Sequence, residues 1–363
     1  MGKVQLMFVA VLAAAVFSAF GTELGLPLSL DCSKPDAVRK LEREIRERKH
    51  NDNLSIYLRD NVIPELPKHK FRWIDISGHS SEVIDLTPLV GHTPKSLSLS
   101  YGTFSNLSSL ETAKIENLTA SFGAVLYADD LSRGNWSALK NLTLLAIRGK
   151  VLDLRSAARL EDLGLYDGNS DLVIRFAPQM RLRKLVICGE LLPLLRSIHT
   201  RKLEKLYVFP GGTADYAPLA EAELPELISL NCYAPGRAPC RLPFMPKLKK
   251  LDLEKFPAVS LKHIRTQCPA LEHLRLTGIP TVADWEELSK MPLRRLHVDT
   301  CGGAKWSLPV DPPPGCRVTG LPPFTENPYK MWSAWAVLTV LFGVWTFFRQ
   351  KRMRRASEKE EVK

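Results

Sequence analysis

Leu248-Lys-Lys-Leu251-Asp-Leu253 is one copy of a pattern that recurs along this 363-residue chain. The pattern is a leucine, two variable residues, a second leucine, one variable residue and a third apolar residue. The other full copies start at Leu160, Leu182, Leu203, Leu271 and Leu293, and two looser copies start at Leu142 and Leu227. Successive first leucines are separated by 18 to 24 residues. A repeat of this length predicts one short strand per turn of a solenoid, with the three apolar side chains in a continuous core.

The pattern weakens toward the N-terminus. Three shorter apolar alternations, Leu54–Ile56, Ile74–Ile76 and Leu97–Leu99, match the strand core of a repeat. Between residues 110 and 141 the register stays open, because Leu110–Ile115 and Leu118–Ala120 are competing candidates for the next strand. We expect about eleven or twelve repeat units over residues 51–300.

The segments outside the strands predict a cap and a convex side of short turns. Asp36–Lys49 has apolar residues at helical spacing, which indicates a helix that covers the first repeat within a cap at residues 22–50. Prolines recur between the later strands and disfavour long helices there. We expect 3₁₀ turns, loops and a few helical pieces such as Leu261–Gln267 and Val282–Lys290.

Residues 1–21 have the pattern of a secretory signal peptide. Lys3 supplies the positive start, the run from Val4 to Phe20 is mostly apolar, and Ala19 and Gly21 are the small residues that a signal peptidase reads. The alternative is an uncleaved first helix that anchors the chain in a membrane.

Residues 331–348 contain no charged residue and are long enough to cross a bilayer as a helix. Five basic residues follow within 349–355, and positive charge beside a membrane span faces the cytoplasm. With the signal peptide, this predicts a single-pass type I protein of the cell membrane with its N-terminus outside; an internal secretory membrane is the alternative location. The proline-rich segment 301–330 predicts a C-terminal cap and a semi-rigid stalk. The cytoplasmic tail, 349–363, is too short for a signalling domain.

The net charge of +11 is unevenly divided. The tail has seven basic and three acidic residues and Lys3 adds one charge, so +6 falls on residues 22–330. This excess mildly favours acidic partners such as glycosaminoglycans or sialylated surfaces. Nucleic acid is not an expected partner, because the predicted extracellular domain has no basic-aromatic motif.

Glycosylation sequons are confined to the N-terminal half of the chain. All five have the form Asn-x-Ser/Thr without proline, and they begin at Asn53, Asn106, Asn117, Asn135 and Asn141. Because N-linked glycans face solvent, we expect a sugar-coated N-terminal half and a bare C-terminal half that holds the contact surface.

Seven cysteines are an odd number for an oxidising compartment. Cys301 and Cys316 flank the exit of the last repeat, and we predict that they form a disulfide that caps the open end. Cys232 and Cys240 are a second candidate pair, although Cys232 stands at a buried position of its repeat. The pairing of Cys32, Cys188 and Cys268 stays open.

Catalytic motifs are absent from the sequence. The eight histidines are scattered, and no HExxH, GxSxG, P-loop or paired-carboxylate arrangement occurs. We therefore expect no enzyme activity, no cofactor and no metal site.

The repeated pattern resembles that of the leucine-rich repeat superfamily, and specifically its extracellular, membrane-anchored receptors and adhesion proteins. The resemblance covers roughly residues 51–300. It implies an α/β solenoid shaped as a horseshoe, with a parallel β-sheet on the concave face and loops, 3₁₀ turns and short helices on the convex face. The asparagine usual after the third apolar position is mostly missing here, and we assign no receptor subfamily.

In this architecture the variable residues between and just after the leucines point outward from the concave face. That places four aromatic residues on neighbouring turns with an arginine beside them: Tyr166, Tyr207, Phe209, Tyr233 and Arg275. Exposed aromatics with arginine are typical of binding hot spots, so we predict that these five residues bind a ligand. The alternative is that the rings pack on one another or beneath a glycan or loop. Other outward residues in the later repeats are mostly charged: Lys249, Lys250, Asp252, His273, Arg295 and His297.

The leading hypothesis is a cell-surface recognition protein that binds a protein or glycoprotein ligand on its concave face, and the positive net charge favours an acidic ligand. Because its tail holds no signalling domain, it would act as an adhesion molecule or as a co-receptor for a signalling partner. The alternative is a structural surface-coat or secretory-pathway membrane protein without a specific extracellular ligand.

Overall fold

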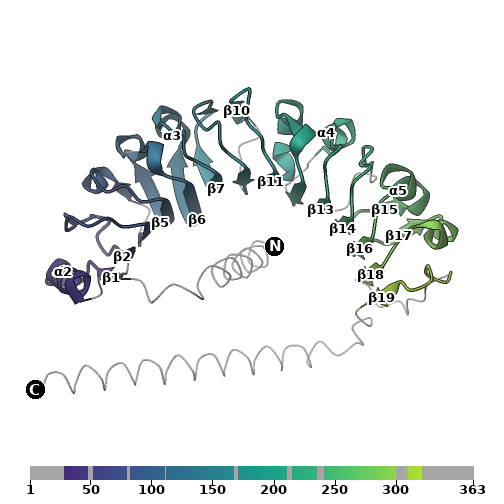
Figure 1. Cartoon of the computed structure of the whole chain (residues 1–363), viewed down its shortest axis with the longest axis horizontal. Helices are drawn as coiled ribbons and strands as arrows, with labels where there is room; N and C mark the ends of the chain where they lie inside the picture. The colour runs from purple at the N-terminus through teal and green to yellow at the C-terminus, as the bar shows by residue number, and fades with distance from the viewer. Residues whose placement is uncertain are drawn as a thin grey trace, which may run out of the picture.

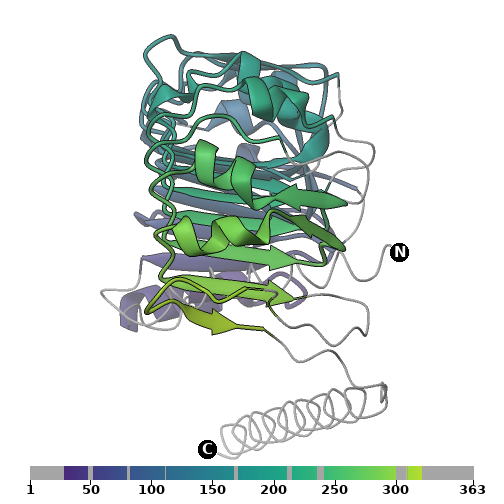
Figure 2. The same cartoon turned by 90° about the vertical axis from the view of Figure 1, so that its right-hand side faces the viewer.

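The computed structural model describes residues 28–47, 52–79, 82–110, 112–166, 171–210, 215–234, 241–299, 308 and 310–320. These residues form an arc, with strands along its inner side and helices along its outer side (Figure 1). Seen from one end of the arc, the strands run side by side in the same direction (Figure 2). The prediction of a parallel-sheet solenoid is confirmed.

One 15-stranded sheet runs the length of the described chain, and its strand pairs are parallel. Fourteen of its strands follow one another along the arc, and β4 (Val83–Asp85) pairs with β5 beside this path. The fourteen are β1 (Leu28–Asp31), β2 (Asn53–Tyr57), β3 (Trp73–Ser77), β5 (Ser96–Ser105), β6 (Asn117–Tyr127), β7 (Asn141–Arg148), β9 (Asp162–Leu165), β11 (Lys184–Cys188), β12 (Lys205–Phe209), β13 (Ser229–Tyr233), β14 (Lys250–Glu254), β16 (His273–Thr277), β18 (Arg295–Asp299) and β19 (Arg317–Thr319).

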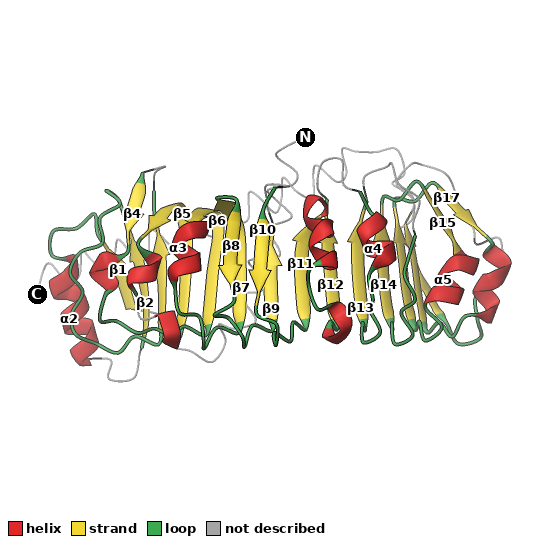
Figure 3. Cartoon of the chain, turned by 90° about the horizontal axis from the view of Figure 1, so that it is seen from above, coloured by secondary structure: helices red, strands yellow, loops and turns green. Residues whose placement is uncertain are grey.

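Short helices and two small sheets form the convex side (Figure 3). The small sheets pair β8 (Val151–Leu154) with β10 (Val173–Phe176), and β15 (Ala258–Ser260) with β17 (Thr281–Ala283). The α-helices are α2 (Ala37–Glu47), α3 (Ala128–Arg133), α4 (Ala217–Glu221) and α5 (Leu261–Gln267). The 3₁₀ helices are η1 (Thr87–Leu89), η2 (Leu107–Ser109), η3 (Thr112–Lys114), η4 (Gly189–Arg196), η5 (Thr200–Lys202) and η6 (Trp285–Lys290).

The core lies directly behind the sheet, because every repeat contributes its leucines in the same register. Leu251 of β14 pairs with Leu230 of β13 and with Leu274 of β16, and all three are at most 2% exposed. Burial of one leucine side chain contributes about 1.5–3 kcal/mol to the free energy of unfolding. Because each leucine is buried against the leucines of adjacent repeats, each turn of the solenoid is stabilised by its neighbours.

The structure decides between the two candidate strands near residue 118. Leu118 and Ala120 of β6 pair with Leu97 and Leu99 of β5, so this segment is the strand. The competing segment, Leu110–Ile115, lies on the convex side and includes η3. Its apolar residues are buried as well, which is why composition alone did not separate the two.

The helical predictions agree in part with the structure. The expected cap helix is α2, and the expected piece Leu261–Gln267 is α5. The prediction of a helical piece over Val282–Lys290 was wrong at its start, because Thr281–Ala283 pairs as a strand with β15 and the 3₁₀ turn begins at Trp285. The sheet also extends beyond the predicted repeats, through β1 at one end and β19 at the other.

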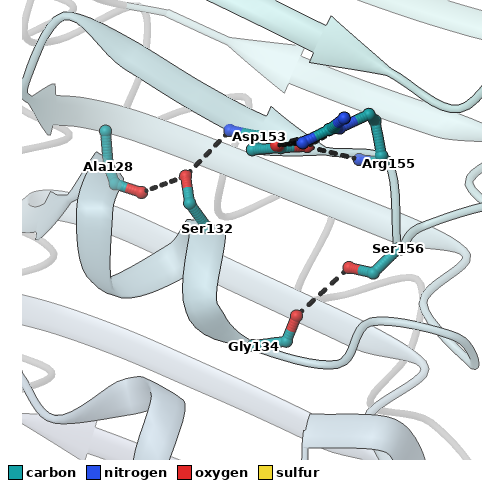
Figure 4. Close-up of polar contacts among 6 residues, drawn as sticks. All are labelled: Ala128, Ser132, Gly134, Asp153, Arg155 and Ser156. Atoms are coloured by element: carbon teal, nitrogen blue, oxygen red, sulfur yellow. Dashed lines mark hydrogen bonds and ion pairs between the residues drawn. The ribbon is translucent and has the colours of Figure 1, made fainter.

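Polar contacts join neighbouring turns on the convex side (Figure 4). The Ser132 hydroxyl at the end of α3 donates to the Ala128 carbonyl (2.6 Å) and accepts from the backbone N–H of Asp153 (2.8 Å) on β8. The Ser156 hydroxyl donates to the Gly134 carbonyl at 3.1 Å. These bonds satisfy backbone groups that the irregular connections leave outside the sheet.

Three predicted segments lie outside the described residues: the signal peptide at 1–21, the membrane span at 331–348 and the cytoplasmic tail at 349–363. In the part of the chain that the structure describes, no helix is both long and apolar enough to cross a membrane.

Candidate functional site

The concave face of the C-terminal half is organised in three rows of side chains. Each strand there turns its first, third and fifth residues outward, and the parallel register aligns these positions from strand to strand. The start row is Lys184, Lys205, Ser229, Lys250, His273, Arg295 and Arg317. The central row is Val186, Tyr207, Asn231, Asp252, Arg275, His297 and Thr319. The end row is Cys188, Phe209, Tyr233, Glu254, Thr277 and Asp299.

A shallow depression of about 350 Å³ lies over strands β12 to β19. Its walls come from two of the rows, and the strands at the leucines between these rows lie beneath it. The lining residues are Tyr207, Asn231, Asp252, Arg275, His297 and Thr319 of the central row, Ser229, Lys250, His273 and Arg295 of the start row, and Leu230, Leu251 and Leu274. These leucines turn their side chains into the core and are at most 2% exposed, so the side chains that a ligand can reach are those of the two rows.

Asp252 is the one carboxylate that lines this depression. Its Oδ2 accepts a hydrogen bond from Asn231 Nδ2 at 3.3 Å and lies 3.7 Å from Arg275 Nη1. Burial raises the pKa of Asp252 from its ordinary value, while the positive charge of Arg275 and the ring of His297 act in the opposite direction. The network holds Asp252 and Arg275 together in the middle of the central row.

His297 stands next to this network with an unused ring nitrogen. Its Nδ1 is 3.1 Å from the Thr319 hydroxyl, so β19 fixes one side of the ring. Its Nε2 is shielded from solvent and has no hydrogen-bond partner among the described residues. A polar group of a ligand, or a small movement of the ring, would satisfy this nitrogen.

The five predicted ligand-binding residues do not form one cluster. Tyr207 and Arg275 both line the depression. Tyr166 packs instead on Phe209, with ring centroids 5.4 Å apart, and burial raises the pKa of its hydroxyl. Tyr233 lies under the ammonium of Lys255, at 5.1 Å from the ring centroid. The alternative that rings pack on one another thus describes Tyr166 and Phe209. Tyr207 has the Lys184 ammonium 6.0 Å from its ring centroid, and it still lines the depression together with Arg275.

The sequence interpretation left out most of the polar residues of the depression. The repeat pattern predicts that Asp252, His273 and His297 face outward, but the predicted site comprises only the four aromatic residues and Arg275. The alternation of these polar residues with the leucines was the signal that would have found them. Thr319 had no such signal, because β19 lies in the segment interpreted as cap and stalk.

The sequons occupy different positions on the solenoid. Asn117 and Asn141 pair with each other across β6 and β7, and Asn141 Nδ2 donates to Asn117 Oδ1 at 2.5 Å. Asn106 and Asn135 are exposed in connections outside the long sheet, whereas Asn53 in β2 is only 8% exposed. Glycosylation at these sites stays a prediction, and Asn53 is the least accessible of the five.

The disulfide predictions also stay open. Cys316 has a free thiol in the structure, and its predicted partner Cys301 lies outside the described residues. Cys232 pairs with Leu253 in the sheet and is fully buried, as its repeat position requires, while Cys240 is again outside the described residues. Burial raises the pKa of Cys268 to about 12.

No group of three or more His, Cys, Asp or Glu side chains that could hold a metal ion occurs in the described ranges. The sequence matches no protein-family model and no curated protein.

Proposed function

We propose that this chain is a leucine-rich repeat protein of the cell surface that binds a protein or glycoprotein ligand in the depression on its concave face. The observation that carries this proposal is the depression itself. It combines an exposed arginine, a tyrosine and several hydrogen-bonding side chains on one face, which is the composition of a recognition surface.

The curvature of the solenoid supports the same proposal. A concave sheet presents side chains from many repeats to one partner, and its rigid backbone limits the conformational entropy that is lost on binding. The predicted membrane span would hold the concave face at the cell surface, which fits adhesion or co-receptor action.

The test uses the full-length chain purified in a mild detergent and probed with a panel of secreted and cell-surface glycoproteins. A variant with Tyr207→Ala and Arg275→Ala would be compared with a control variant, Tyr57→Ala. Tyr57 is also an exposed aromatic residue of the sheet, but it lies in β2 at the far end of the arc.

We expect saturable binding that is lost in the Tyr207/Arg275 variant and kept in the Tyr57 variant, with unchanged circular dichroism in both. Removal of two central contacts should weaken binding by roughly 2–4 kcal/mol. Binding that survives the double substitution would reject the depression as the site. Absence of any saturable ligand, together with failure of surface biotinylation to label the chain on intact cells, would favour a structural or secretory-pathway role.

A further inference from the structure

Two adjacent rows of the concave side carry charge in different ways. The residues just before the strands alternate in sign and neutralise one another across neighbouring repeats. Arg183 lies 3.9 Å from Glu161 and 3.0 Å from Glu204. Glu272 lies 3.2 Å from Lys249 and 3.6 Å from Arg294. This outer row therefore has little net field of its own.

The start row is one residue further along each strand and is not neutralised. Lys184, Lys205, Lys250, Arg295 and Arg317 form no ion pair with any residue that the structure describes. All except the half-buried Lys184 are exposed. Most nearby carboxylates are used by the outer row, so these cations keep their charge available to a ligand; the exception is Asp162, which pairs with Lys184 in the register at the β9 end of the row.

His273 lies within this row, and its pKa responds to the positive charges beside it. It stands between Lys250 and Arg295 in the register. Its pKa is lowered, first by burial and then by the positive charges of Arg295 and Lys250, against the weaker opposite effect of Glu272. The part of this lowering that comes from Arg295 and Lys250 shows a positive field at His273, and such a field favours an anion.

The geometry of the row indicates a long ligand rather than a compact one. Neighbouring strands lie about 4.8 Å apart, so the seven positions from Lys184 to Arg317 span about 29 Å. The charges follow a line across the strands and do not converge on one point. The end row on the opposite side carries Glu254 and Asp299 instead, so the face is basic along one edge and acidic along the other.

We propose that the start row from Lys184 to Arg317 binds the anionic groups of a sulfated polysaccharide that lies across strands β11 to β19. The proposal rests on the proposed function of the concave face and names the ligand class of that face. Sulfates contact the lysines and arginines, and sugar hydroxyls reach the amide of Asn231 and the hydroxyl of Thr319 in the adjacent central row.

Two other linear polyanions fit the face less well. Single-stranded nucleic acid needs aromatic side chains on which bases stack, and the start row has none. An acidic peptide that adds to a sheet needs unpaired backbone groups, but the strands beneath this row are paired on both sides from β11 to β18. A sulfated sugar chain uses side chains alone, and this face offers both cations and neutral hydrogen-bonding groups.

The experiment measures binding of the full-length chain to heparin, with desulfated heparin, a single-stranded oligodeoxynucleotide and polyglutamate as competitors. A Lys205→Glu/Lys250→Glu variant is compared with Lys202→Glu/Lys262→Glu, which changes the net charge equally. Lys202 and Lys262 are exposed on η5 and α5, on the convex side. A milder Lys205→Gln/Lys250→Gln variant keeps the test valid if the charge reversal disturbs folding.

We expect the start-row reversal to weaken heparin binding at least about thirtyfold and the convex control to change it less than about threefold. Desulfated heparin should not compete, and affinity should fall steeply with salt. Equal losses in both variants, or stronger competition by the oligonucleotide or polyglutamate, would overturn the proposal. If a protein ligand still requires Tyr207 and Arg275 while heparin does not bind, the polysaccharide inference fails and the proposed function stands.

Discussion

Replacement of Asp252 by asparagine should strengthen binding of the polyanion, although it removes a partner of Arg275. Asp252 follows Lys250 by two residues in β14, and a strand rises about 3.3 Å per residue. A sulfate seated on Lys250 is therefore about 6.6 Å or more from this carboxylate. The repulsion at that distance is about 0.6 kcal/mol in water and about 2.5 kcal/mol at an effective dielectric constant of 20.

These limits correspond to a gain in affinity of roughly threefold to seventyfold. The lower end is expected at physiological salt, because the depression is open to solvent and ions screen the charge. The structural cost is small: the Arg275–Asp252 pair is 3.7 Å long and its arginine is half exposed. Such pairs contribute about 0–1 kcal/mol. The asparagine side chain can still accept the hydrogen bond from Asn231.

The Asp252→Asn substitution should also not lower the free energy of unfolding near neutral pH. Burial raises the folded-state pKa of Asp252, so its ionised form opposes folding and stability is lost as the pH rises through that raised value. The amide carries no such penalty. Thermal unfolding at pH 7 should therefore show a midpoint equal to that of the wild type or slightly higher.

Heparin titration by fluorescence or calorimetry measures the affinity, with Glu286→Gln as the matched control. Glu286 is an exposed carboxylate on η6, away from the concave face, and its loss should change the affinity by less than about twofold. If Asp252→Asn weakened heparin binding, or strengthened it no more than the control does, the placement of the anion along the start row would be refuted.

Three further changes test the packing and the electrostatics. Gly78→Ala should destabilise the fold by about 3 kcal/mol or more in urea unfolding, because the new Cβ would lie 2.1 Å from the backbone oxygen of Tyr101. The control is Gly91→Ala, whose Cβ meets nothing within 4 Å. It should cost only about 1–2 kcal/mol, because alanine is strained in the left-handed backbone conformation at this position. Leu251→Ala should cost about 2–5 kcal/mol in the same assay, and a loss below 1 kcal/mol would contradict the continuous core. Heparin affinity should rise as the pH falls from about 8 to 5, because a bound anion raises the pKa of His273 and favours its protonated form, and His273→Gln should flatten this profile.

The fold was largely predictable because each repeat carries its own local pattern. Leu251 and Leu253 bracket one outward residue, and the same spacing recurs at a nearly constant interval, so strand and core follow from sequence alone. The region around β6 was ambiguous because a buried convex segment, Leu110–Ile115, is as apolar as the strand. There the ladder is also irregular, with a register shift and a positive φ at Phe122, and no local pattern encodes this.

The site was less predictable because it depends on which residues of different repeats become neighbours. Alternation showed that Lys250 and Arg275 face outward, but the choice of aromatic residues assumed that all four rings stay available. The rings of Tyr166 and Phe209 pack on each other across Cys188, whose side chain is small. Likewise, the outer row mixes glutamates with its cations whereas the start row from Lys184 onward holds no acid, a difference that shows only when the strands are aligned in register.

The start-row position holds different types of residue in the two halves of the arc. At β6 and β7 it holds Asn117 and Asn141, which hydrogen-bond to each other and are both sequon asparagines; at β9 it holds Asp162, and from β11 onward it holds five cations with Ser229 and His273. A glycan at either asparagine would cover the row at β6 and β7. Glycosylation would leave accessible the start row from Lys184 to Arg317, where the unpaired charges and the depression coincide. The position of the sequons and the position of the charges therefore point to the same half of the concave face by independent physical arguments.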